Sequence, residues 1–150
     1  MARFRYRMQN ILSVKEKLET QAKNEFAIAA ATVAEEEDKL NILKRRQEEY
    51  RDYLKKLQQG ELDFKRIKET AEAIDAMNYL IDEQKRVLER AEKVLELKRV
   101  ALAEAVQEVK THEKLKEKEF NQFMADEAAK ESKEIDELVS YRFGQNSSDT

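Results

Sequence analysis

Residues 67–109 read IKETAEAIDAMNYLIDEQKRVLERAEKVLELKRVALAEAVQEV, and this stretch has the most regular hydrophobic periodicity in the chain. An aliphatic residue returns at every seventh position, in the row Ile67, Ile74, Ile81, Leu88, Leu95, Leu102 and Val109. One flank of this row carries Leu80, Val87, Val94 and Ala101, and the other carries Met77, Ala91 and Ala105. Seven successive heptads place these side chains on one stripe of a helix, which is the seam of a coiled coil.

Residues that break helices are nearly absent from the whole chain. Its 150 residues include no proline and only two glycines, Gly60 and Gly144. Proline ends or kinks a helix and glycine raises its entropic cost, so two long helices are expected. We predict one arm over about 3–58, a turn around Gly60 and a second arm over about 63–143. Glycine also suits a helix C-terminus, so a disordered tail is predicted over 144–150.

The first arm carries a less regular seam. One heptad position is interrupted by Lys15 and Glu36 and otherwise holds Met8, Ala22, Ala29, Leu43, Tyr50 and Leu57. The companion position holds Phe4, Ile11 and Leu18, and then, one residue out of phase, Phe26, Val33, Leu40 and Leu54. This pattern predicts that the seam slips between Leu18 and Phe26, with a local change of supercoil.

A short connection at Gly60 makes the two arms antiparallel neighbours. Pairing outward from the turn brings Leu18 near Leu102 and Ile11 near Val109. The expected fold is therefore an all-α, single-domain antiparallel coiled-coil hairpin. Residues after about Lys116 have no first-arm partner, yet an apolar face continues through Phe120, Phe123, Met124, Ile135, Leu138 and Val139. This overhang is either a partner surface or a frayed end.

The charge pattern limits the classes of partner. Charged residues make up 41% of the chain and the formal net charge is -3, which argues against nucleic acid as the main partner. The longest apolar run, residues 26–34, has nine residues and is too short to span a bilayer, so no direct membrane insertion is expected. Residues 3–7 alternate arginine with aromatic residues, as a nucleic-acid or membrane arm does, but the acidic balance opposes that interpretation.

No constellation of residues supports catalysis or metal binding. The single histidine, His112, has no second histidine at zinc-site spacing and falls on a seam position. The acidic run 35–38 points around the helix and does not converge on one ion. The chain also has no cysteine and no glycine-rich phosphate loop. We therefore expect no enzyme activity and no cofactor.

Both ends of the chain resemble a known family. The opening FRYRMQNIL at 4–12, the KEKLE that follows at 15–19 and an Ala/Glu-rich stretch resemble the start of FliJ proteins, and the ending KEIDELVSYR at 133–142 resembles their closing motif. FliJ is the soluble coiled-coil component of the flagellar type III export apparatus. The resemblance covers nearly the whole chain.

The resemblance implies a cytoplasmic hairpin similar to the central stalk of rotary ATPases, peripherally associated with the inner-membrane export apparatus. Its implied partners are the hexameric export ATPase, the cytoplasmic part of the membrane export gate and empty substrate chaperones. It implies an ATPase-ring contact at Asp136 and Glu137. The gate contact would lie at Ala73, Met77, Leu80 and Gln84, although Met77 and Leu80 equally suit a position flanking the seam.

Two other kinds of protein remain as alternatives. A stalk subunit of a true rotary ATPase would normally carry a globular insert between its arms, and here only a short turn region surrounds Gly60. A structural coiled-coil adaptor or filament protein would have the same periodicity, and its assembly with concentration would distinguish it.

Overall fold

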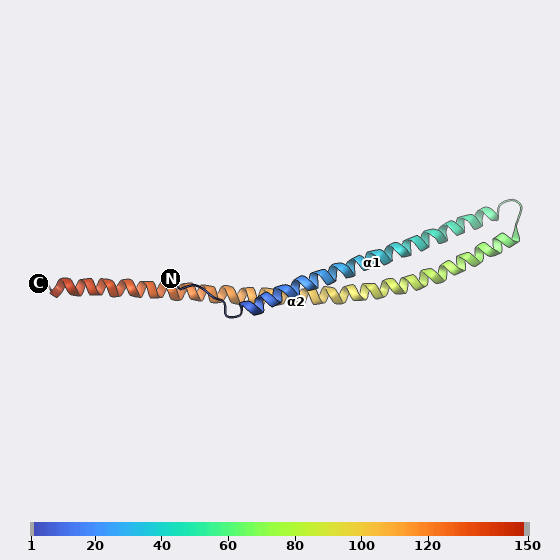
Figure 1. The fold of residues 1–150 in the computed structure, drawn as a ribbon. Coiled ribbons are helices and arrows are strands. Elements are labelled where there is room, and N and C mark those ends of the chain that lie inside the picture. Colours follow the sequence, from blue (N-terminus) through green and yellow to red (C-terminus); the bar gives the residue numbers. More distant parts are fainter. Residues whose placement is uncertain (1, 149–150) are drawn as a thin grey trace. The chain divides into compact units, whose positions relative to one another are not determined.

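The computed structural model describes residues 2–148, with side chains described for residues 2–146. Two α-helices account for most of this part of the chain: α1, Gln9–Leu57, and α2, Phe64–Ser148 (Figure 1). The chain divides into two compact units. Unit 1 comprises Met1–Glu19 and Glu104–Thr150, and unit 2 comprises Thr20–Ala103. Each unit pairs a part of α1 with a part of α2.

In unit 2 the chain reverses through residues 58–63. Gly60 has a φ of 84°, a left-handed conformation that glycine adopts without steric cost. The backbone N–H groups of Gln58 and Gln59 donate to the carbonyls of Leu54 and Lys56, which closes the end of α1. The Asp63 carboxylate accepts the backbone N–H of Arg66 at 3.3 Å and so caps the start of α2.

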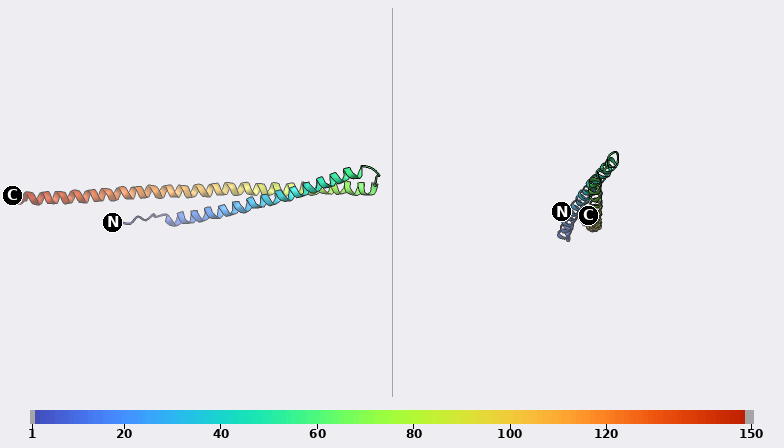
Figure 2. Two further views of the ribbon diagram at one scale, coloured as in Figure 1. Left: turned by 90° about the horizontal axis from the view of Figure 1, so that it is seen from above. Right: turned by 90° about the vertical axis from the view of Figure 1, so that its right-hand side faces the viewer.

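The two helices of unit 2 pack antiparallel along the predicted seam. They lie side by side in Figure 1 and cross near the turn in the perpendicular view of Figure 2, as helices that wind around each other do. All seven residues of the aliphatic row in α2 are buried or half-buried. The all-α antiparallel coiled-coil hairpin that the sequence predicts is confirmed.

The seam of α1 does not slip, so the sequence-based prediction is wrong at this point. Ile11 and Leu18 are 43% and 47% exposed, whereas Leu12 is only 2% exposed. Counting back in sevens from Phe26 leads through the half-buried Glu19 to Leu12. The heptad therefore continues in one phase, and the polar residues Lys15 and Glu19 occupy seam positions because their aliphatic stems pack while their charged ends reach water.

In unit 1, α1 begins at Gln9. The start near residue 3 that the sequence predicts is therefore wrong. Residues 2–6 are non-helical, and the side chains of Phe4 and Tyr6 are turned inward while Arg3, Arg5 and Arg7 are exposed. An extended segment turns alternate residues to opposite sides, so both aromatic side chains can pack while three arginines stay in water. This geometry explains the alternation of arginine and aromatic residues in 3–7.

The helical part of α2 also differs from the prediction, because it runs through Gly144 to Ser148. Gly144 does not adopt a positive φ, and a glycine inside a helix costs only about 1 kcal/mol relative to alanine. Of the predicted tail over 144–150, residues 149–150 lie outside the described residues.

Candidate partner-binding surfaces

Polar contacts between α1 and α2 set the register of unit 2. Lys98 forms an ion pair with Glu25 at 3.2 Å, and Gln84 donates to both the backbone carbonyl and the carboxylate of Glu36. Closer to the turn, the buried Gln47 donates to Asn78. Each pair joins one residue of α1 to one of α2, so a shift of one heptad would break all three pairs and leave the buried amide of Gln47 without this partner.

The residues of the implied gate contact do not form one exposed patch. Met77 is 7% exposed and packs in the seam, and Ala73 and Gln84 are half-buried. The amide of Gln84 is already bonded to Glu36. Leu80, at 45% exposed, is the one large apolar residue of the four that a partner can reach without separating the helices.

The polar seam makes the stability of unit 2 depend on pH. Hydrogen bonds from Gln84 and then Lys39 lower the pKa of the Glu36 carboxyl below its ordinary value, and the bond from Lys98 does the same for the pKa of Glu25. A lowered pKa in the folded state means that the unfolded chain binds more protons as the pH falls. The stabilisation is therefore present above about pH 4.3 and is lost below it.

We expect Glu36→Gln to lower the melting temperature at pH 7 and to have little effect at pH 3, because protonation removes the carboxylate bond in the unaltered chain. Circular-dichroism melting of both proteins at several pH values measures this. Glu37→Gln, at an exposed neighbouring position, serves as the control and should show no such convergence. An equal difference between Glu36→Gln and the unaltered chain at both pH values would contradict the assignment.

Unit 1 is held by an aromatic and aliphatic cluster. Tyr6, Leu12 and Val109 are buried together, with Phe4 packed against them. Val109 packs with Leu12, the sequence neighbour of Ile11, while Ile11 itself is 43% exposed. Lys15 and Glu108, which are close to Leu12 and Val109 in sequence, form an ion pair at 3.2 Å.

The overhang is shorter than predicted, because the N-terminal segment covers its first part. The ring of Phe4 lies 5.2 Å from that of Phe120 and 5.5 Å from that of Phe123, and Lys116 donates to Gln9 at 2.7 Å. Phe123 is half-buried in this packing of unit 1, whereas Phe120 contacts Phe4 and remains 43% exposed. Met124 is 51% exposed at the edge of this contact.

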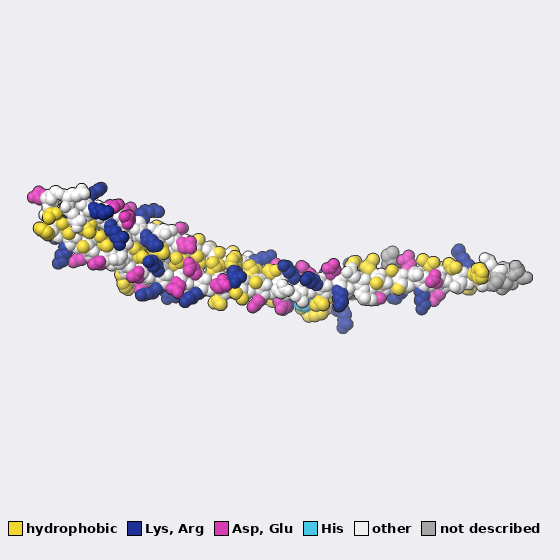
Figure 3. Space-filling model, turned by 180° about the vertical axis from the view of Figure 1, so that it is seen from behind, with side chains coloured by type: hydrophobic (Ala, Val, Ile, Leu, Met, Phe, Trp, Pro, Cys, Tyr) yellow, Lys and Arg dark blue, Asp and Glu magenta, His cyan; other side chains and the backbone are white. Residues whose placement is uncertain are grey.

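The exposed apolar part of the overhang lies further along α2. Ile135, Leu138 and Val139 are 52%, 61% and 60% exposed. Figure 3 shows hydrophobic side chains interrupting the charged surface along this end of α2. Asp136 and Glu137 lie among them, also exposed, and neither forms an ion pair with any residue that the structure describes. The two carboxylates and the three apolar residues lie within five positions of each other in the sequence. The structure leaves all five side chains exposed.

Two buried polar atoms of unit 1, the Tyr6 hydroxyl and His112 Nδ1, have no hydrogen-bond partner among the residues that the structure describes. His112 is half-buried at its seam position. Among residues 2–148 no group of three or more His, Asp or Glu side chains is arranged to hold a metal ion. No helix within this range has a stretch long and apolar enough to cross a membrane.

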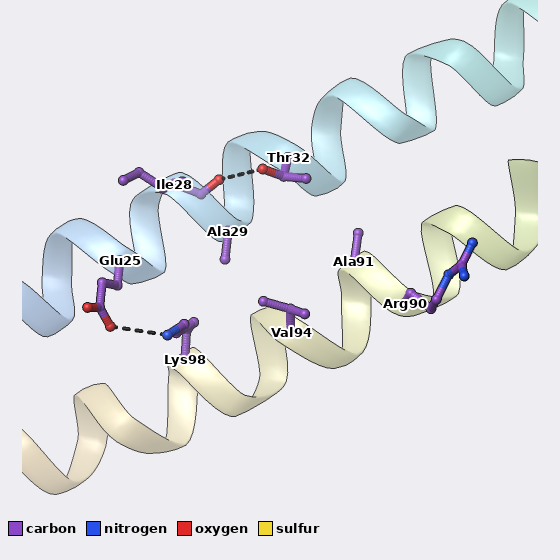
Figure 4. A pocket seen from close by; sticks show the side chains of 8 residues that line it. All are labelled: Glu25, Ile28, Ala29, Thr32, Arg90, Ala91, Val94 and Lys98. Carbon is purple, nitrogen blue, oxygen red and sulfur yellow. Dashed lines mark hydrogen bonds and ion pairs between the residues drawn. The ribbon is translucent and has the colours of Figure 1, made fainter.

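A shallow groove crosses unit 2 where both helices carry alanine in the seam. Ala29 of α1 and Ala91 of α2 each point toward the opposite helix, offset along the groove, with Val94 between them and Ile28 beside Ala29 (Figure 4). The Glu25–Lys98 ion pair closes one end, and Thr32 and Arg90 line the rest. The groove encloses about 410 Å³. It exists because two methyl side chains do not fill the space that larger seam residues fill elsewhere.

Comparison with known proteins agrees with this geometry. No curated protein matches the chain in sequence. A solved structure of CT670 from Chlamydia trachomatis, described as a YscO homologue, superposes with a TM-score of 0.78 over 99% of this chain and 100% of that chain, at 20% identity, and so shares the fold. The model of the family described as flagellar FliJ protein matches residues 4–148. The chain therefore belongs to the FliJ family, a component of the flagellar type III export apparatus.

Proposed function

We propose that this protein docks in the ring of the flagellar export ATPase, promotes its assembly and activity, and links the ring to the membrane export gate. It also escorts empty substrate chaperones and works in the cytoplasm at the periphery of the inner-membrane apparatus. The observation that carries the ring contact is the accessible end of α2, where apolar side chains lie together with two carboxylates that have no ion-pair partner in the described part of the chain. A coiled-coil hairpin docked in the ATPase ring has a role like that of the central stalk of a rotary ATPase.

The apolar and acidic residues at this end have separate roles in the proposed contact. Burial of Ile135, Leu138 and Val139 against the ring supplies hydrophobic stabilisation, since all three are more than half exposed in the free protein. Asp136 and Glu137 face basic groups of the ring, which orients the contact. The gate contact is assigned to Leu80, because Met77 and Gln84 are engaged within unit 2.

The test is to add the protein to the purified export ATPase and to measure ATP hydrolysis and hexamer formation together. Stimulation of both at near-stoichiometric ratio is expected. Asp136→Lys with Glu137→Lys should weaken binding to the ATPase at least about tenfold, the factor that corresponds to 1.4 kcal/mol, while helicity is unchanged. Leu88→Asp should abolish stimulation by opening the seam of unit 2.

A matched control is available in unit 2, where Glu69 and Glu72 are exposed and form no ion pair with any described residue. Glu69→Lys with Glu72→Lys changes the net charge by the same amount and should leave ATPase binding intact. Equal affinity of the Asp136/Glu137 variant and the control variant would remove the end of α2 from the ring contact. Absence of stimulation by the folded, monomeric protein would favour a simple coiled-coil adaptor.

A further inference from the structure

The two flanks of the α2 seam are used differently in unit 2. The flank that carries Met77 and Ala91 is turned into the helix pair, and its residues are buried or half-buried. On the flank that carries Leu80, Val87 and Val94, Val87 is half-buried, whereas Leu80 and Val94 are 45% and 46% exposed. One side of the helix pair in unit 2 is therefore apolar without being part of the intramolecular core.

Residues of α1 extend this apolar side. Ile28 is 67% exposed and lines the groove together with Val94, so both lie on the same side of the helix pair. Ile42 follows Ile28 by two heptads and is 47% exposed, and Leu97 follows Arg90 by one heptad and is 70% exposed. Large apolar side chains thus continue in both directions from the groove, along the line of the helices.

The groove is suited to side chains from a third helix. It is open to solvent along its length, with a volume of about 410 Å³. Its floor is formed by Ala29 and Ala91, and small residues allow a neighbouring helix to approach closely. An amphipathic helix that lies along such a groove inserts its large apolar residues at a spacing of three or four.

Charge at the groove indicates the chemistry of the partner. The Glu25 carboxylate is neutralised by Lys98 at 3.2 Å, whereas Arg90 is exposed and has no ion-pair partner among the described residues. The groove therefore presents one uncompensated positive charge. A carboxylate on the incoming helix would pair with Arg90, and a lysine at the same place would be repelled.

A second copy of the chain fits this site poorly. A two-fold dimer centred on the groove would place the groove against itself and Arg90 against its own copy. Two hollows do not fill each other, and two guanidinium groups repel. These features favour a different protein as the occupant.

We propose that the groove of unit 2 is a docking site for one amphipathic helix of a partner protein, which inserts a large apolar residue over Ala29 and Ala91 and pairs a carboxylate with Arg90. The site involves both helices of unit 2 and is separate from the end of α2 that the proposed ATPase contact uses.

The probe is a synthetic helical peptide of about 18 residues, long enough to form several turns. It carries leucines on one side, a central phenylalanine and a glutamate four residues from it, and fluorescence anisotropy with the full-length protein gives its Kd. Ala91→Leu, which fills the groove from within, should weaken binding at least tenfold. Val94→Gln, at the exposed rim, should also weaken binding and does not alter the seam.

Charge reversal gives the sharper test. Arg90→Glu should weaken the glutamate peptide and strengthen a peptide with lysine in the same position, so that the preference between the two peptides reverses. Lys68→Glu is the matched control, since Lys68 is exposed, does not line the groove and lies on α2 about six turns of helix from Arg90. It should leave both Kd values unchanged.

Several outcomes would overturn the proposal. These are an undetectable interaction with the unaltered protein, binding by the Ala91→Leu and Val94→Gln variants that is as tight as binding by the unaltered protein, or no change of preference in Arg90→Glu. A dimer in sedimentation that Ala91→Leu dissociates would assign the groove to a second copy instead. ATPase stimulation should be unaffected by Ala91→Leu, which separates this proposal from the function of the α2 end.

Discussion

Replacing Leu12 with aspartate is expected to unfold the helix pairing of unit 1. Leu12 is 2% exposed and packs with Tyr6 and Val109. Removing a buried leucine costs about 2–5 kcal/mol, and burying a carboxylate there adds a desolvation cost. We therefore expect a loss of at least about 3 kcal/mol, seen as a lower melting temperature and as faster hydrogen exchange of backbone amides in residues 9–19.

Ile11→Asp is the decisive comparison, because the sequence assigns the seam to Ile11 and the structure assigns it to Leu12. Ile11 is 43% exposed, so its replacement should cost about 1 kcal/mol or less. A larger effect at Ile11 than at Leu12 would restore the slipped seam that the sequence suggested.

The second large effect is expected in unit 2, at Met77. Met77→Asp places a carboxylate at a position that is 7% exposed, so the helix pair should lose several kcal/mol, about as much as other buried apolar-to-charged replacements. Thermal melting followed by circular dichroism measures the loss. Any accompanying loss of gate binding would then reflect unfolding and not a missing contact.

Leu80→Asp separates these two effects. Leu80 is 45% exposed, so the variant should melt within a few degrees of the unaltered protein. If the gate binds at Leu80, its affinity for this variant should fall at least about tenfold. Unchanged affinity of a folded Leu80→Asp variant would place the gate contact elsewhere on the surface.

The candidate surfaces were predictable from the sequence only in part. Ile135, Leu138 and Val139 read as an apolar face of the overhang, and the structure leaves them exposed. Phe120 and Phe123 read the same way, but the ring of Phe4 packs on both. That contact forms because the N-terminal segment is not helical. Heptad spacing applies only to helical residues, so it could not indicate that Phe4 packs on these two rings.

Leu12 and the groove illustrate two different reasons for a missed residue. Leu12 had a usable signal, since the spacing of seven continues through Glu19 to Phe26, but the apolar Ile11 and Leu18 favoured the neighbouring phase. By contrast, no signal in the sequence indicates that Arg90 and Ala29 line the same groove. Their juxtaposition arises from the register between α1 and α2, which the pairs Glu25–Lys98 and Glu36–Gln84 set in three dimensions.

The amino-acid pattern is enough to derive two helices, their turn at Gly60 and the seam of α2, because these follow from local helix propensity and from a spacing of seven that repeats along one chain. Three features required the packed structure: which of two neighbouring residues enters the core of unit 1, the burial of Met77 beside an exposed Leu80, and the place where two alanines leave a groove. The physical reason is that burial depends on what lies opposite. A side chain's own sequence neighbours define the stripe on which it lies, whereas the partner helix and the extended N-terminal segment determine how much of that stripe is covered.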